Sequence, residues 1–245
     1  MDIRLLMHNE VALVKLNTQL QTSQFSTINH ATGTGKSFIG LKYAYQNKDK
    51  RILYLTPTYP IFHQLKKHMK TLGISLNDFK KFDHMIYRNL MSCNMETLAK
   101  EYDIIICDEY HRCGAKKWGQ KVKQLKEIIK EKYPDKKMIG LTATPTRYLD
   151  NERNMTKELF DGKCASTLDL SDAIINGLLP APVYICTSMN NKTSINSLKV
   201  KVEKDVFYQR DKEKYNEVIH NLDNVVDEIS KSDLNFKEYI KEDNG

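Results

Sequence analysis

Two short segments of this sequence carry residues that can act together on a phosphate group. The first, Ala31-Thr32-Gly33-Thr34-Gly35-Lys36-Ser37, follows a predicted strand and begins a predicted helix. Glycines let backbone N–H groups approach phosphate oxygens, and the helix that follows points its unpaired N–H groups at the same anion. Lys36 can then reach the terminal phosphates. The predicted phosphate-binding residues are Thr32, Gly33, Thr34, Gly35, Lys36 and Ser37.

The second segment, Asp108-Glu109-Tyr110-His111, can supply the metal ligand and the base that such a loop needs. It directly follows the apolar run at 104–107, which lacks alternation and so predicts a strand buried on both faces. A carboxylate at that strand end can hold Mg²⁺ opposite the loop serine, so the predicted metal ligands are Ser37 and Asp108. Glu109 can orient or deprotonate an attacking water. The predicted catalytic residues are Lys36, Asp108, Glu109 and His111.

Each segment also has a simpler interpretation. The strict loop motif has a glycine where this chain has His30, so the first segment can be an ordinary glycine-rich turn. The second can be a solvated acidic turn, and a lone histidine such as His111 is often only a surface residue. The functional interpretation is favoured because it explains why the loop joins a strand to a helix and why the carboxylates follow an apolar run.

The two segments can act on one phosphate only if the fold holds them side by side. Short apolar or β-branched runs predict strands at 26–29, 51–56, 82–87, 103–107 and 137–142. Helix-like segments lie between them, at 36–46, 61–71, 89–101 and 118–132. This alternation predicts an α/β fold in which helices cover both faces of a parallel sheet. Ligands bind beyond the carboxyl ends of the strands in such sheets, which is where both segments lie.

The two ends of the chain differ from this central pattern. Leucines and valines among polar residues predict a helix before residue 26. Near the C-terminus, a strand-like run at 183–187 precedes a polar stretch, which predicts a domain at 1–187 and a linker at 188–200. Apolar residues at helical spacing between Val218 and Ile229 then predict a charged helical extension at 201–245 with one apolar face.

Composition narrows the class of protein. No stretch approaches the roughly 18 apolar residues of a membrane span, and the N-terminus is not a secretory signal, so we expect a cytoplasmic protein without a membrane partner. The five cysteines include no pair with zinc-site spacing, which favours reduced thiols. The net charge of +7 suits a phosphate-rich partner, although a lysine-rich composition gives the same charge without one.

Taken together, these segments resemble the first, ATP-binding RecA-like motor domain of superfamily-2 helicases and translocases of the DEAD/DEAH-box and restriction-endonuclease type. The resemblance covers about residues 4–184. The loop at 31–37 looks like motif I, and 108–111 looks like motif II in its DExH form. The segment Leu141-Thr142-Ala143-Thr144-Pro145 looks like motif III, which implies that Thr142, Ala143 and Thr144 couple nucleotide state to the grip on nucleic acid.

The resemblance also implies ligands and partners. The segment Tyr54-Leu55-Thr56-Pro57-Thr58 is similar to motif Ia, which implies a nucleic-acid surface with DNA favoured over RNA. Its implied contacts are Thr56, Pro57, Thr58, Gln64 and Tyr87. Asn9 lies where the family often has a glutamine that reads adenine, so the implied cofactors are ATP, bound in part by Asn9, and Mg²⁺.

A complete motor of this kind has a second RecA-like domain that supplies arginines to the terminal phosphate. Nothing beyond Ser188 resembles another strand–helix set, so we expect this chain to hydrolyse ATP weakly alone and to need a second motor domain, on another chain or in a longer protein. One alternative is a nucleotide-gated nucleic-acid or protein-binding adaptor with vestigial hydrolysis. A kinase or GTPase is disfavoured, because no guanine-reading motif or arginine-rich lid occurs at a convincing place.

Overall fold

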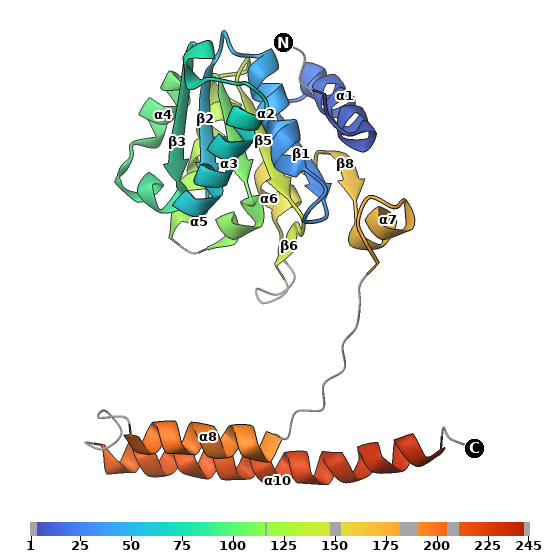
Figure 1. Ribbon diagram of the computed structural model, residues 1–245. Coiled ribbons are helices and arrows are strands. Elements are labelled where there is room, and N and C mark those ends of the chain that lie inside the picture. Colours follow the sequence, from blue (N-terminus) through green and yellow to red (C-terminus); the bar gives the residue numbers. More distant parts are fainter. Residues whose placement is uncertain (1–3, 116, 148–152, 182–190, 205–210, 243–245) are drawn as a thin grey trace. The chain divides into compact units, whose positions relative to one another are not determined.

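The computed structural model describes residues 4–115, 117–147, 153–181, 191–204 and 211–242, and the chain divides into two compact units (Figure 1). The first unit is residues 1–181 and the second is residues 182–245. The predicted strand-like run at 183–187, with the predicted domain boundary at 187, lies outside the described residues. No helix in the described ranges has both the length and the apolar composition of a membrane span.

The first unit is built on a six-stranded sheet in the order β3-β2-β4-β5-β1-β8, in which every pair of neighbours is parallel. The strands are β1 (Phe25–His30), β2 (Arg51–Thr56), β3 (Lys81–Ile86), β4 (Ile104–Asp108), β5 (Lys137–Thr142) and β8 (Cys164–Leu168). The prediction of a parallel sheet from five strands is therefore confirmed. The sixth strand, β8, was not predicted, because its short sequence Cys-Ala-Ser-Thr-Leu carries little apolar character and lies at the sheet edge.

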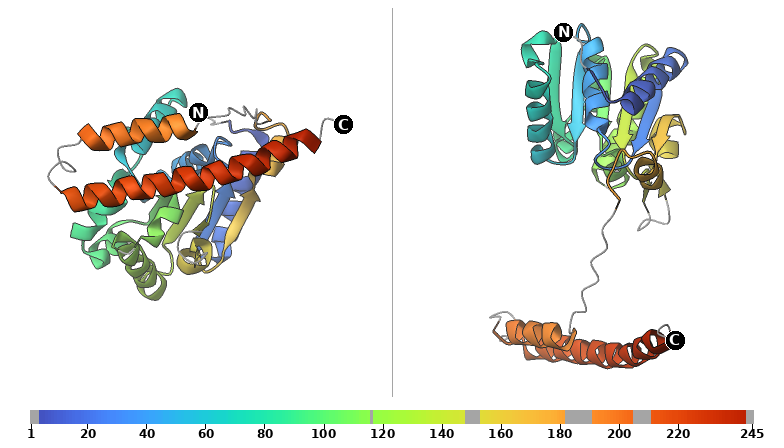
Figure 2. Two further views of the ribbon diagram at one scale, coloured as in Figure 1. Left: turned by 90° about the horizontal axis from the view of Figure 1, so that it is seen from below. Right: turned by 45° about the vertical axis from the view of Figure 1, so that its right-hand side comes forward.

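Helices cover both faces of this sheet, as predicted (Figure 1 and Figure 2). One face packs against α1 (Met7–Thr22), α2 (Lys36–Gln46) and α3 (Tyr59–Thr71). The other packs against α4 (Met95–Glu101), α5 (Trp118–Lys132) and α6 (Met155–Phe160). Strand β4 explains why two layers form: Ile104 and Ile106 join one buried cluster, whereas Ile105 and Cys107 join the other, because successive side chains point to opposite faces.

Short 3₁₀ turns change some of the predicted boundaries. The predicted strand at 82–87 ends at Ile86, and η2 (Tyr87–Ser92) occupies the start of the predicted helix at 89–101. The α-helix begins only at Met95, because the side chain of Asn94 accepts a hydrogen bond from the Thr97 N–H and caps that helix. The remaining short elements are η1 (Leu76–Asp78), η3 (Tyr110–Gly114), β6 (Thr146–Arg147), β7 (Arg153–Asn154) and α7 (Leu170–Ile175).

The second unit is a pair of helices, α8 (Asn191–Lys204) and α10 (Lys212–Glu242), which lie side by side (Figure 1 and Figure 2). The helical extension predicted at 201–245 overlaps α10, and the linker predicted at 188–200 overlaps α8, which begins at Asn191. Ile195 of α8 is buried, and Lys199 forms an ion pair with Asp223 of α10. The segment is helical because a partner helix covers one side of it, and local composition does not reveal that partner.

Candidate functional site

The glycine-rich loop connects β1 to α2 at the carboxyl edge of the sheet. Gly33 and Gly35 have φ angles of +88° and +92°, a left-handed region that residues with a Cβ rarely adopt. A Cβ at Gly35 would also lie 2.7 Å from the Asn9 side-chain nitrogen. Within the loop, the Thr34 hydroxyl donates to the Ala31 carbonyl at 2.7 Å. The glycines therefore allow a tight curl directly before the N-terminus of α2.

Lys36 is the first residue of α2 and turns back into this loop. Its Nζ donates to the Ala31 carbonyl oxygen at 3.2 Å, and the side chain is largely buried. Burial lowers the pKa of Lys36, while the carboxylates of Glu109 and Asp108 act against that shift. Lys36 nevertheless lines a cavity of about 340 Å³, here called the Lys36 cavity. Its other lining residues are Thr32, Gly33, Gly35, Ser37, Phe38, Ile61, Gln64, His68, Asp108 and Glu109.

Asp108 meets the loop across this cavity. Its Oδ2 lies 3.5 Å from the Ser37 Oγ, which donates to it, and the Tyr54 hydroxyl donates to the same oxygen at 3.1 Å. Burial, reinforced by the neighbouring carboxylate of Glu109, raises the pKa of Asp108 to about 6. Ser37 and Asp108 thus present hard oxygen ligands to one point, the donor set that Mg²⁺ prefers, and a cation there would relieve the buried negative charge.

Tyr54 was missed by the sequence analysis. It lies in β2, is fully buried, and was considered only as part of the motif Ia segment. A usable signal was present, because a buried tyrosine hydroxyl needs a hydrogen-bond partner and the neighbouring strands carry few. Strand β2 pairs with β4, so the carboxylate of Asp108 at the end of β4 is within reach.

Glu109, His111 and Thr142 form a chain of contacts from the acidic segment to the end of β5. The Glu109 Oε2 lies 3.2 Å from the His111 Nδ1, which lies 2.8 Å from the Thr142 Oγ1. Burial acts to raise the pKa of Glu109, but His111 and Lys36 outweigh it, and the pKa falls below its ordinary value. Glu109 is therefore charged at neutral pH beside a lysine. The predicted coupling residues Ala143 and Thr144 follow directly, and the Thr144 N–H donates to the Thr142 Oγ1 at 3.3 Å.

Asn9 in α1 holds the other side of the loop. Its Nδ2 donates to the Thr34 carbonyl at 2.9 Å, while its Oδ1 is buried without a hydrogen-bond partner among the described residues. Asn9 lines a second cavity of about 430 Å³, here called the Asn9 cavity. Its other lining residues are Arg4, Leu5, Leu6, Gly33, Thr34, Gly35, Phe38 and Leu72. Apolar walls with one unpaired acceptor fit a planar base that carries an amino group.

The five predicted nucleic-acid contacts do not lie together. Pro57, Thr58 and Tyr87 line a third cavity of about 870 Å³, here called the Trp118 cavity. Gln64 instead lines the Lys36 cavity. Thr56 is fully buried, where its hydroxyl donates to the Thr58 carbonyl at 3.0 Å and lies 2.7 Å from the His84 Nε2. The structure therefore gives Thr56 the position of a residue that shapes the turn at Pro57.

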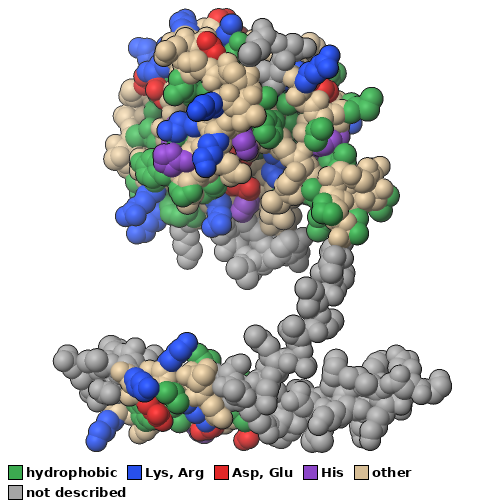
Figure 3. Space-filling model, viewed as in Figure 1, with side chains coloured by type: hydrophobic (Ala, Val, Ile, Leu, Met, Phe, Trp, Pro, Cys, Tyr) green, Lys and Arg blue, Asp and Glu red, His purple; other side chains and the backbone are tan. Residues whose placement is uncertain are grey.

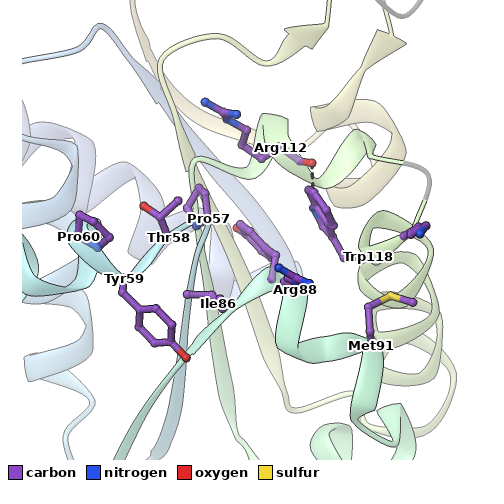
Figure 4. Close-up of a pocket in the computed structure, with 11 residues that line it drawn as sticks. Pro57, Thr58, Tyr59, Pro60, Ile86, Arg88, Met91, Arg112 and Trp118 are labelled. Atoms are coloured by element: carbon purple, nitrogen blue, oxygen red, sulfur yellow. Dashed lines mark hydrogen bonds between the residues drawn. The ribbon is translucent and has the colours of Figure 1, made fainter. Parts of the chain in front are cut away.

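The Trp118 cavity also contains residues that the sequence analysis did not assign to a site. Its remaining lining residues are Tyr59, Pro60, Ile86, Arg88, Met91, Arg112, Lys117 and Trp118 (Figure 4). Figure 3 shows Lys and Arg side chains scattered over the viewed face of the first unit, so basic charge alone does not mark a site. Only the fold brings Arg88, Arg112 and Lys117 around one cavity, since they come from η2, η3 and the residue before α5.

Comparisons with known proteins show the family and the fold of this chain. The family model described as type III restriction enzyme, res subunit, matches residues 2–147. No curated protein matches the chain. The solved structure of the Escherichia coli DEAH/RHA helicase HrpB is similar with a TM-score of 0.52 and 15% identity, over 81% of this chain and 26% of that chain. The Pyrococcus furiosus Hef helicase domain is similar with a TM-score of 0.51 and 15% identity, over 77% of this chain and 44% of that chain.

A third solved structure, the DUF1998 helicase MrfA bound to DNA and AMPPNP, has a TM-score of 0.51 and 16% identity, over 82% of this chain and 32% of that chain. The chain thus spans less than half the length of each of these three proteins. At these identities the likeness concerns the fold. It confirms the predicted RecA-like parallel sheet with helices on both faces.

Proposed function

Since this chain belongs to the family described as type III restriction enzyme, res subunit, and has the first RecA-like domain of a superfamily-2 helicase, we propose that it binds ATP and Mg²⁺ and hydrolyses ATP as part of a nucleic-acid motor. The observation that supports this most directly is the convergence of Lys36, Ser37 and Asp108 on one cavity. Asp108 lies 71 positions after Ser37 in the sequence, and a solvated acidic turn has no reason to meet a glycine-rich loop.

Each residue around the nucleotide is proposed to have a separate role. The loop N–H groups and Lys36 bind the phosphates, with the lysine exchanging the Ala31 carbonyl for a phosphate oxygen. Ser37 and Asp108 would hold Mg²⁺, which would neutralise phosphate charge when bound. Glu109 lies beside Lys36, is ionised at neutral pH and can accept a proton from water. Asn9 would accept a hydrogen bond from an adenine amino group through its unpaired Oδ1.

The link between nucleotide and nucleic acid is proposed to run through His111. Its Nδ1 contacts both Glu109 and Thr142, so a change at the cavity carboxylate reaches the segment after β5. Tyr87 offers a second connection, because it lines the Trp118 cavity while its hydroxyl donates to the Asp108 carbonyl at 2.8 Å. We propose DNA as the favoured partner, in keeping with the DNA bound to MrfA in its solved structure.

Full activity is proposed to need a second RecA-like domain. An arginine supplied to the terminal phosphate is typically worth about 10³–10⁵ in rate, or roughly 4–7 kcal/mol of barrier. The chain spans less than half the length of the helicases to which it is similar, so such a domain is proposed to lie on a partner chain or in a longer protein. A steady-state turnover of several per second by the purified chain would contradict this requirement.

A Glu109→Gln variant tests the enzyme against the adaptor alternative. The amide cannot accept the proton of water, so turnover should fall by about 10²–10⁴-fold. The affinity for a fluorescent ATP analogue should stay within about twofold, because Gln keeps the volume of Glu. Glu131→Gln, at an exposed position late in α5, is the matched control. If Glu109→Gln binds ATP and leaves both turnover and nucleic-acid affinity unchanged, the adaptor interpretation replaces the enzyme.

A further inference from the structure

The Trp118 cavity has a composition that phosphate binding alone does not require. Besides three basic side chains, its walls include three aromatic rings, Tyr59, Tyr87 and Trp118, and a set of apolar side chains. These apolar residues are Pro57, Pro60, Ile86 and Met91. A volume of about 870 Å³ lies within the roughly 300–1,000 Å³ range of pockets that enclose an organic ligand. The cavity therefore offers room and apolar surface for a planar group as well as charge for an anion.

Trp118, the first residue of α5, is held in place by a hydrogen bond to η3. The indole Nε1–H donates to the Arg112 carbonyl at 3.2 Å, which fixes the edge of the ring against η3 (Figure 4). The next residue is Gly119, where a Cβ would lie 2.0 Å from the Cys113 carbonyl oxygen. The start of α5 thus approaches η3 more closely than any residue other than glycine at position 119 would permit. Because the indole edge is fixed while its side chain stays partly exposed, the ring is preorganised as a wall of the cavity.

The charges around the cavity are all of one sign. Arg88, Arg112 and Lys117 are exposed, and no Asp or Glu lines the cavity among the described residues. In Figure 4, Pro57 and Thr58 lie on one side of the cavity, and Trp118 and Met91 lie on the other, with Arg88 between them. Among the described residues neither Arg88 nor Arg112 forms an ion pair with a carboxylate, so both guanidinium groups can bind phosphate oxygens in pairs of hydrogen bonds.

Aromatic walls beside such cations distinguish one form of nucleic acid from another. In a duplex the bases stack on each other and their faces are covered, whereas a single strand exposes them to aromatic side chains. Proteins that bind single strands combine a basic groove with rings on which bases stack, largely without regard to sequence. The Trp118 cavity unites both features within one recess.

We propose that the Trp118 cavity binds single-stranded nucleic acid, with one base stacked on Trp118 and the adjoining phosphates at Arg88, Arg112 and Lys117. This inference rests on the proposed motor function, and it adds a base-binding subsite to a surface otherwise expected to contact the backbone. It also makes Trp118 a sensor of binding, because it is the only tryptophan of the chain.

Intrinsic fluorescence tests the stacking directly. A thymidine oligonucleotide of about 12 residues, titrated into the purified chain, should quench the Trp118 emission as it binds. An abasic oligonucleotide of equal length carries the same phosphates without bases. It should bind roughly 5- to 100-fold more weakly, the range that one lost stacking contact typically gives, and should leave the emission largely unchanged. Equal affinity and equal quenching by the two oligonucleotides, or by a duplex of the same length, would overturn the proposal.

Substitutions separate stacking from charge and from folding. Trp118→Ala should weaken thymidine binding, followed by anisotropy of labelled oligonucleotides, by roughly 5- to 100-fold and leave abasic binding unchanged, whereas Trp118→Phe should retain most of the affinity. Arg112→Ala should weaken both oligonucleotides by the same factor. Tyr133→Ala removes a partly exposed ring roughly 20 Å away at the other end of α5 and should change neither. If Trp118→Ala does not fold, the Phe variant and the abasic comparison still decide the question.

ATP binding distinguishes a failure of this proposal from a failure of the motor function. If a fluorescent ATP analogue binds and turns over while thymidine and abasic oligonucleotides bind alike, the stacking subsite is wrong and the motor function stands. If the bases quench Trp118 but no ATP binds, the subsite stands and the proposed motor function is wrong.

Discussion

The Lys36 cavity and the Trp118 cavity lie at the same edge of one sheet and differ in the balance of their charges. Two consecutive elements serve one cavity each, since Asp108 ends β4 in the first cavity and the following η3 carries Arg112 into the second. The Lys36 cavity sets one lysine against two carboxylates. The Trp118 cavity has three basic residues and, among the described residues, no acidic one. A cavity with charges of both signs suits a phosphate bound with a metal ion, whereas a cavity with only positive charges suits a polyanion.

Burial sharpens this difference. Lys36 is 7% exposed and Asp108 is 2% exposed, so their interactions act in a low dielectric and are weakly screened by salt. Arg88, Arg112 and Lys117 are exposed, so their attraction to phosphates should fall as salt rises. The chain thus separates a site of few strong interactions from a surface of several weak ones.

Among the tests of this difference between the cavities, the largest effect is expected from Lys36→Ala, which should damage one cavity only. The substitution leaves bound phosphate charge without its buried cation, a loss of roughly 3–4 kcal/mol or about 10²–10³-fold in the Kd for ATP. Oligonucleotide affinity without nucleotide should stay within about twofold. Isothermal titration with an ATP analogue and anisotropy with a labelled oligonucleotide give the two values, and Lys50→Ala, in the exposed turn after α2, is the control. A parallel loss of both affinities would mean that the cavities are not separate sites.

Asp108→Asn should stabilise the nucleotide-free protein at neutral pH. The pKa of Asp108 rises from 3.8 to about 6 on folding, so the carboxyl destabilises the fold progressively between these pH values and fully above about 6. The difference corresponds to about 3 kcal/mol as an upper bound. Chemical denaturation without Mg²⁺ should therefore favour the variant strongly at pH 7.5 and only slightly at pH 4.

Mg²⁺ with ATP should reverse that order, because only the wild type holds the ion through a carboxylate. Denaturation midpoints measured with both ligands at pH 7.5 should rise for the wild type and stay nearly constant for Asp108→Asn. If the variant is less stable than the wild type at pH 7.5 without ligands, the buried carboxylate of Asp108 does not destabilise the fold.

A smaller effect is expected from Thr142→Val, which tests the proposed coupling through His111. The variant keeps the shape of the side chain but removes the hydroxyl, which contacts His111 and also accepts a hydrogen bond from the Thr144 N–H. Losing one such hydrogen bond costs about 1–1.5 kcal/mol, so stimulation of ATP hydrolysis by single-stranded DNA should fall roughly 5- to 10-fold. Basal ATP affinity should not change. Thr18→Val, on the exposed side of α1, is the control, and equal stimulation in both variants would exclude Thr142 from the coupling.

The smallest effect is expected from Arg88→Ala. Removing one exposed cation should weaken oligonucleotide binding only a few-fold at physiological salt, and should reduce the slope of log affinity against log salt by about 0.7 for a single strand. Lys80→Ala, an exposed lysine outside the cavity, should leave the slope unchanged. An unchanged slope for Arg88→Ala would remove that arginine from the phosphate contacts.

The sequence predicts the Lys36 cavity far better than the Trp118 cavity, and the reason is physical. The loop at 31–37 and the carboxylates at 108–109 are each contiguous, and each requires particular residue types for backbone curvature or for charge. The Trp118 cavity joins residues 57–60, 86–91 and 112–118. None of these segments needs a particular residue type for its backbone conformation, apart from the glycine that follows the last of them. Its one local signal was Gly119 beside the only tryptophan, which indicates a close approach that fixes the ring.

The helical pair of α8 and α10 shows a second reason why an element is not predicted from the sequence. The polar composition of the segment at 188–200 predicts a linker, yet α8 occupies most of it. Ile195 and Lys199 acquire their roles only through α10. Likewise, β8 becomes a strand through its pairing with β1 rather than through its own composition. Elements whose stability comes from a neighbour far away in the sequence are the ones that local patterns miss.

Glu109 adopts a backbone conformation that a carboxylate-bearing residue rarely takes, with φ at +51°. This left-handed geometry costs an ordinary L-residue roughly 1–2 kcal/mol, whereas glycine or asparagine adopts it with little strain. A screen of random variants for heat resistance alone should therefore enrich Glu109→Gly and Glu109→Asn, and every such clone should lose turnover. The position marks a point where robustness and activity oppose each other within a single residue.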